Sequence, residues 1–227
     1  MSARAISFPL LRMVRNPRGR WAVLPWIVFG IVLAVISRGR SDGASHVLVG
    51  SFATFVVPLL SFSIATLVIG KGTLVEALAP LTTLGASRER AGLTITFGVM
   101  LASAVTSACL GVIVVIVSHG SGDPPLSRDL FATLWISSLA GICYGAYFSA
   151  ASTLFGRFGR SAFLLFDFVL GGGSAVSSLF VPRAHVRSLL GGAHALTLSQ
   201  HASALVLIML TLTCLALVLV RLRTGRS

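Results

Sequence analysis

The chain has 227 residues, of which 55% are hydrophobic and 11% charged, and its mean hydropathy is +0.93. Soluble domains carry roughly 25% charged residues, so this composition excludes a soluble enzyme. The formal net charge of +12 does not indicate a nucleic-acid partner, because nucleic-acid-binding proteins gather basic residues on one solvated face, whereas here the basic residues lie at the ends of apolar runs.

The N-terminal segment, residues 1–20, is predicted to lie in the membrane interface. Ile6, Leu10 and Met13 fall near one face of a helix and the arginines of the segment fall elsewhere, which is the pattern of an amphipathic interfacial helix. Pro17 and Gly19 would then turn the chain toward the first span. The alternative is a flexible basic tail.

Six apolar runs follow, and none of them contains Lys or Arg. A helix that crosses a bilayer needs about 20 mostly apolar residues, because its backbone must be satisfied internally. We therefore expect an all-α integral membrane protein with one transmembrane domain of six helices over residues 21–220. Pro58 lies inside the second run, which we keep as one span because membrane helices tolerate Pro. The runs are 21–37, 47–70, 91–118, 130–155, 161–181 and 202–220.

The basic residues predict the orientation of these spans. If the six runs alternate, 13 of the 18 Lys and Arg residues lie in the N-terminal segment, in the connections after the second and fourth runs, and in the basic tail 221–227. Only the remaining 5 lie on the other side. Because Lys and Arg accumulate in short cytoplasmic loops, both the N-terminus and the C-terminus are expected to be cytoplasmic.

The connection over residues 71–90 combines helix-forming residues with charge. Thr73 is followed three residues later by Glu76, which is the spacing of a capping box. This pattern predicts a short helix that begins at Leu74. The alternative is a simple connection between two spans.

The segment over residues 182–201 is moderately apolar and lies on the other side of the membrane in this arrangement. It is predicted to form two short re-entrant helices broken at Gly191 and Gly192; an ordinary surface loop is the alternative. His185, His194 and His201 are nine and seven residues apart, and no Cys or Glu is near them. Because these spacings do not form a compact ligand pair, no metal site is expected.

Asp167 is the only acidic residue inside a predicted span. Charged groups within a bilayer are rare and usually face the bundle interior, so Asp167 is a candidate for an intramembrane polar site. The competing interpretation is structural, since Asp167 lies only seven residues after Arg160 and would pair with a basic residue near the surface. Gly171, Gly172 and Gly173 are predicted to allow close helix packing.

The chain contains no Gly-x-x-x-x-Gly-Lys-Ser/Thr phosphate-binding loop. We therefore expect that it is not an enzyme and holds no cofactor of its own. If ATP drives its function, ATP and magnesium must be bound by another polypeptide.

The stretch from Gly72 through Thr73, Leu74, Glu76 and Leu78, followed by Ser87 and Arg88, resembles the permease subunits of bacterial type-2 ATP-binding-cassette exporters. The resemblance covers nearly the whole chain, including the number of spans, the interfacial N-terminus and the outer segment. The chain departs from the family in the residues that open the third run, Arg90 and Ala91, and in its histidine-rich outer loop.

The resemblance implies a multi-pass permease of the bacterial cytoplasmic (inner) membrane that exports an apolar or amphipathic substrate as a homodimer or a heterodimer. In the family, the segment after the second span is a coupling helix seated on the ATPase subunit. Two alternatives stay open: a haem-exporter-like subunit for cytochrome maturation, and a non-transporting accessory or assembly protein. The residues implied in coupling are Leu74, Glu76, Leu78, Arg88 and Glu89.

Overall fold

The computed structural model describes residues 17–83, 85–172 and 176–224. Most of the predicted interfacial segment 1–20 lies outside this part of the chain, and residues 17–20 form the first turn of a helix instead. The described residues form helices, turns and loops, and no strand occurs among them. The helices are α2 (Pro17–Ile36), α3 (Gly43–Val47), the π-helical η1 (Leu48–Val56), α4 (Val57–Ile69), α5 (Leu74–Thr82), α6 (Arg88–Ser118), α7 (Leu126–Leu154), the 3₁₀ turn η2 (Gly156–Phe158), α8 (Gly159–Leu170), the 3₁₀ turn η3 (Val176–Phe180), α9 (Pro182–Leu189), the 3₁₀ turn η4 (Ala195–Thr197) and α10 (Gln200–Thr224).

Within the described residues, four helical stretches are long and apolar enough to cross a membrane. Three of them are α6, α7 and α10, and the fourth is the stretch Gly43–Thr82, which includes α3, η1, α4 and α5. A fifth apolar helix, Trp21–Ile36, is shorter. The chain therefore has the architecture of an all-α membrane protein, as its composition predicts.

The fifth apolar run does not form the continuous helix that its composition predicts over residues 161–181. Helix α8 ends at Leu170, and Gly171 and Gly172 form a turn. With 12 residues, α8 is roughly 18 Å long, whereas the hydrocarbon core of a bilayer is roughly 30 Å thick. Helix α8 alone is therefore too short to cross. The helix ends at this point because a run of three glycines follows, and glycine loses more backbone entropy in a helix than any other residue.

The second run remains helical around Pro58, although its hydrogen-bonding pattern changes there. The nine residues of η1 form a π-helix, and α4 begins at Val57 with Pro58 in its first turn. Proline has no N–H to donate and clashes with the carbonyl four residues before it. The wider π turn before Pro58 accommodates this clash, so the chain continues from η1 into α4 without a break.

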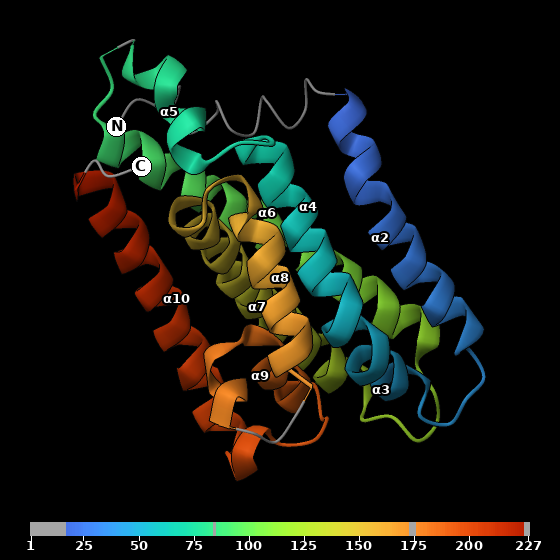
Figure 1. Ribbon diagram of the computed structural model, residues 1–227. Helices are drawn as coiled ribbons and strands as arrows, with labels where there is room; N and C mark the ends of the chain where they lie inside the picture. Colours follow the sequence, from blue (N-terminus) through green and yellow to red (C-terminus); the bar gives the residue numbers. More distant parts are fainter. Residues whose placement is uncertain (1–16, 84, 173–175, 225–227) are drawn as a thin grey trace.

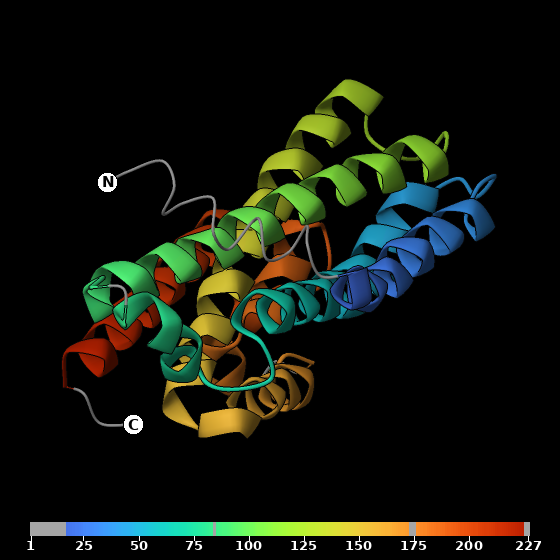
Figure 2. The same ribbon diagram turned by 90° about the horizontal axis from the view of Figure 1, so that it is seen from above.

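Helices α6 and α7 pack against each other, with α2 beside α6 and α10 beside α7 (Figure 2). Two glycines of α7 allow their close approach. A Cβ atom added at Gly141 would lie 2.5 Å from the carbonyl oxygen of Ser103, and one added at Gly145 would lie 2.6 Å from the Cα of Met100. Small residues at such crossings let membrane helices pack backbone to backbone.

Asp123, in the connection between α6 and α7, binds the first turn of α3. Its carboxylate accepts hydrogen bonds from the backbone N–H groups of Ala44 (2.9 Å), Ser45 (3.1 Å) and Gly120 (2.9 Å), and from the Ser45 hydroxyl (2.6 Å). Burial raises the pKa of Asp123, but the hydrogen bonds from Ser45, Ala44 and Gly120 outweigh it and hold the pKa below 3.8. The Asp123 carboxylate therefore links the connection between α6 and α7 to the start of α3.

We expect Asp123→Asn to lower the free energy of unfolding by about 1.5–3 kcal/mol at neutral pH, because hydrogen bonds to a charged group contribute that much. A carboxylate whose pKa is lowered by folding stabilises the protein above its unfolded pKa of 3.8. The difference between wild type and variant should therefore be constant at neutral pH and shrink as the pH falls below 3.8. Detergent unfolding titrations at several pH values measure it, and a difference that grows on acidification would contradict this account.

Candidate functional site

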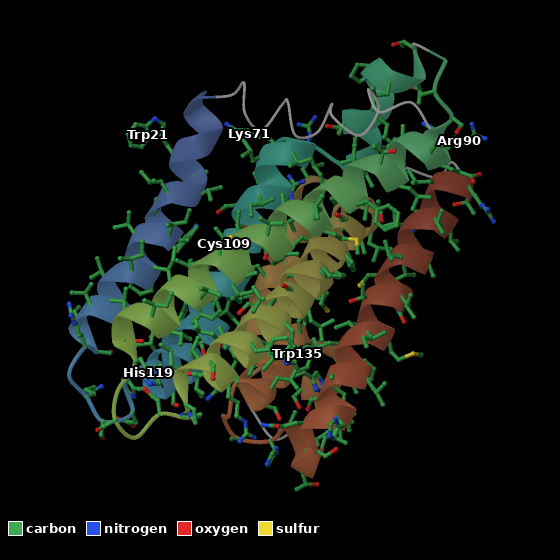
Figure 3. The ribbon with its side chains drawn as sticks, turned by 180° about the vertical axis from the view of Figure 1, so that it is seen from behind. Trp21, Lys71, Arg90, Cys109, His119 and Trp135 are labelled. Atoms are coloured by element: carbon green, nitrogen blue, oxygen red, sulfur yellow. The ribbon has the colours of Figure 1, made fainter. Side chains whose placement is uncertain are left out.

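Helix α5 lies at one end of the bundle, together with the start of α6 and the end of α10 (Figure 1). It begins at Leu74, as the capping pattern predicts, and the Thr73 hydroxyl accepts a hydrogen bond from the Glu76 N–H at 3.1 Å. Thr73 has the extended backbone of an N-cap residue. Lys71 and Arg90, which flank this connection, lie at the same end (Figure 3).

The two faces of α5 have different environments. Leu74 and Leu78 are fully buried and belong to the hydrophobic core, so they seat α5 on the bundle. Glu76, Ala79 and Pro80 are exposed. We call these three residues the α5 surface; it is the part of the helix that another protein could contact.

Two contacts connect α5 and its preceding turn to the start of α8. Glu76 Oε1 lies 3.6 Å from Arg157 Nε in the 3₁₀ turn η2, and both side chains are exposed. The buried Arg160 donates a hydrogen bond of 2.6 Å from Nη2 to the carbonyl oxygen of Gly70, where α4 ends. An exposed ion pair contributes little stability, so the buried Arg160 bond is the stronger of the two connections.

The remaining residues implied in coupling lie at the start of α6. Arg88 is exposed, and Glu89 Oε2 lies 3.4 Å from Arg223 Nε near the end of α10. The structure thus gathers Glu76, Arg88 and Glu89 at one end of the molecule, with Leu74 and Leu78 beneath them.

A second group of polar residues surrounds Asp167 at the junction of α7, α8 and α9. Asp167 is fully buried. Its Oδ2 accepts a hydrogen bond from the Tyr144 hydroxyl at 2.9 Å, and its Oδ1 accepts one from the backbone N–H of Arg183 at 3.1 Å. Arg160 binds Gly70 instead, so the basic residue beside Asp167 comes from the later helix α9 rather than from the start of α8.

The side chain of Arg183 is enclosed by aromatic rings. Its guanidinium carbon lies 4.8 Å from the ring centroid of Phe168 and 5.7 Å from that of Phe55, and Nη1 donates to the carbonyl oxygen of Phe168 at 3.0 Å. Cation–π contacts of this kind are stronger when water is excluded. Together with Asp167, Arg183 fixes α9 against α8.

The three glycines that follow α8 differ in their surroundings. A Cβ atom at Gly171 would lie 2.5 Å from the carbonyl oxygen of Asp167 and 2.8 Å from the Cβ of Arg183, so Gly171 is a point of close packing between α8 and α9. Gly172 has open space around it. Gly173 lies outside the described residues.

The outer segment contains α9 and a single 3₁₀ turn where a second short helix is predicted, and Gly191, with φ of +92°, ends the helical path. His185 is buried in α9, and His194 and His201 lie in the connection to α10 and in its first turn. Across the residues that the structure describes, no three His, Cys, Asp or Glu side chains are grouped closely enough to hold a metal ion.

No family model, curated protein or solved structure matches the chain. Its function must therefore be argued from its own residues. Arg157, Tyr144 and Arg183, which contact the candidate residues, were not singled out by the sequence. Tyr144 could be identified from the sequence, because a tyrosine inside an apolar span needs a hydrogen-bond partner for its hydroxyl.

Proposed function

We propose that this chain is the membrane-spanning permease subunit of an ATP-binding-cassette transporter that exports an apolar or amphipathic substrate. ATP is hydrolysed by a separate ATPase subunit that docks on the α5 surface. The observation that carries the proposal is α5 itself: a capped helix, seated by buried leucines, with an exposed face, that lies between α4 and the long apolar helix α6 in the chain. Such a helix offers a rigid contact for a partner outside the membrane.

The proposed topology has six passages with both termini on the side of α5, which is the cytoplasmic side. The longer helices run in alternating directions in chain order, so that α5 and the end of α10 lie at the same end (Figure 1). They are α2, α4, α6, α7, α8 and α10. The excess of Lys and Arg at this end supports a cytoplasmic location. In this topology the fifth passage is made by α8 and the segment that follows it, which includes the 3₁₀ turn η3.

The contacts of α5 suggest how ATP-driven motion reaches the membrane. A displacement of α5 by the ATPase moves the turn before it and with it Gly70, whose carbonyl oxygen accepts the hydrogen bond of the buried Arg160 at the start of α8. At its other end α8 is connected through Asp167 to α9. We propose that this path shifts α8 against its neighbours and opens a passage between two permease copies in the bacterial inner membrane.

The first test is association with an ATPase. We expect the full-length chain to form a stable complex with an ATP-binding-cassette ATPase encoded by a neighbouring gene when the two are co-expressed. Ala79→Arg, on the α5 surface, should weaken this complex by about tenfold or more, because it places a bulky cation at the contact. Ser41→Arg is the matched control, since Ser41 is exposed on a connection at the other end.

Size-exclusion chromatography with titration of the ATPase measures both results. A wild-type chain that elutes alone, or an Ala79→Arg variant that binds as tightly as wild type, would contradict docking on α5. An effect of Ser41→Arg equal to that of Ala79→Arg would point to a general loss of folding.

A further inference from the structure

A cavity of about 480 Å³ lies at the end of the bundle opposite α5. It is bounded by the first turns of α7 and α10, the end of α9 and the start of η1. Trp135, which lines it, lies on α7 beside α10 (Figure 3). Its volume falls in the usual range of small-molecule sites, roughly 300–1,000 Å³.

Asp129 gives this cavity an unmet hydrogen-bonding requirement. Its Oδ2 atom is shielded from solvent and has no hydrogen-bond partner within the described part of the chain. Asp123 and His119 lie close enough to interact with Asp129 electrostatically, and Asp123 is committed to α3 and Gly120. Leaving a buried carboxylate oxygen unpaired is costly, so a donor supplied by a ligand would stabilise this site.

Arg128 places a positive charge on the same wall. Both ion pairs found among the described residues lie at the α5 end, so the guanidinium of Arg128 is available. The cavity therefore presents a cation and an anion on consecutive residues, and neither is neutralised by the other. A ligand with both a phosphate and an ammonium group matches this arrangement, because guanidinium groups bind phosphate and carboxylates bind N–H donors.

The other walls indicate that the ligand is a lipid. Leu48, Ile136 and Leu189 are among the apolar residues that line the cavity. Outside the cavity, Phe131 and Leu205 are 71% and 62% exposed and continue the apolar surface along α7 and α10. Tryptophan is enriched at the level of lipid headgroups, which is where Trp135 would lie.

We propose that this cavity binds the headgroup of a phospholipid with a primary amine, such as phosphatidylethanolamine. The ammonium group donates to the carboxylate of Asp129, Arg128 binds the phosphate, and the acyl chains lie along Phe131 and Leu205. The proposal goes beyond the permease function and does not depend on an ATPase, so either can fail without the other.

Native mass spectrometry of the purified full-length chain tests the proposal directly. After exchange into defined lipid mixtures, we expect phosphatidylethanolamine to be retained about tenfold more than phosphatidylcholine, whose quaternary ammonium has no N–H to donate to Asp129. Water-soluble glycerophosphoethanolamine should show no measurable retention, because it lacks the acyl chains. Equal retention of the two phospholipids, or binding of the soluble headgroup as tight as that of the lipid, would overturn the proposal.

Two variants with matched controls assign the site to its residues. Asp129→Asn and Arg128→Gln should each reduce retention of phosphatidylethanolamine by about tenfold. Asp42→Asn and Arg38→Gln make the same charge changes at exposed positions on the same end outside the cavity and should retain the lipid. Arg128 is exposed, so its variant should fold even if Asp129→Asn does not. If Arg128→Gln retains as much phosphatidylethanolamine as the wild-type chain does, the assignment is overturned.

Discussion

Replacing Glu76 and Arg88 together by alanine should reduce the ATPase activity of the proposed permease–ATPase complex to that of the isolated ATPase subunit. Both side chains are exposed at the α5 end. A hydrogen bond to a charged group contributes about 1.5–3 kcal/mol, so losing two at a docking contact weakens binding by roughly 100-fold or more. Steady-state ATP hydrolysis at a fixed ATPase concentration, with increasing permease, measures the effect.

Arg157→Ala is the control for this experiment. It removes the 3.6 Å ion pair with Glu76 while leaving the α5 surface unchanged. If Glu76 acts on the partner, Arg157→Ala should retain most of the stimulated activity, because an exposed intrachain pair contributes little. Unchanged stimulation by the Glu76 and Arg88 double variant, with normal membrane insertion, would contradict the coupling role of this surface.

The second large effect is expected at Asp167. Asp167→Ala leaves the Tyr144 hydroxyl and the Arg183 N–H without their acceptor in a buried site. Each such loss costs about 1–3 kcal/mol, so the free energy of unfolding should fall by roughly 2–6 kcal/mol. Unfolding titrations with a denaturing detergent in mixed micelles measure this change.

Tyr144→Phe and Asp167→Asn separate the structural role of Asp167 from a functional one. Tyr144→Phe removes one hydrogen bond and should cost less than Asp167→Ala, and Asp167→Asn keeps one acceptor oxygen and should fall between them. If Asp167→Ala unfolds like wild type, the carboxylate does not hold the helices together. An Asp167→Asn variant of normal stability that no longer transports would instead make Asp167 part of the transport path.

The sequence predicts the helical membrane architecture well because the signal is carried by long apolar runs. Helices α6, α7 and α10 each correspond to one predicted run, and their ends differ from those of the run by at most four residues. The start of α5 is predicted with equal accuracy, because Thr73 and Glu76 interact across three residues of the same helix. Local chemistry determines such features, so a single sequence suffices to find them.

The sequence does not predict contacts between distant segments. The neighbours of Asp167 lie 23 residues before it and 16 residues after it, and the bond from Arg160 to Gly70 spans 90 residues. Hydropathy does not predict the end of α8 at Leu170, because the apolar composition continues through Gly171 and beyond. The three glycines were the available signal.

The unequal lengths of α6 and α8 have a consequence for the membrane around the protein. Helix α6 has 31 residues and α8 has 12. Beside α6 one helix carries the whole apolar surface, whereas beside α8 that surface continues into the 3₁₀ turn η3, where Val176 and Phe180 are exposed. A mismatch between protein and bilayer thickness costs fractions of a kcal/mol for each ångström. A thicker bilayer should therefore strain the molecule more beside α8 than beside α6.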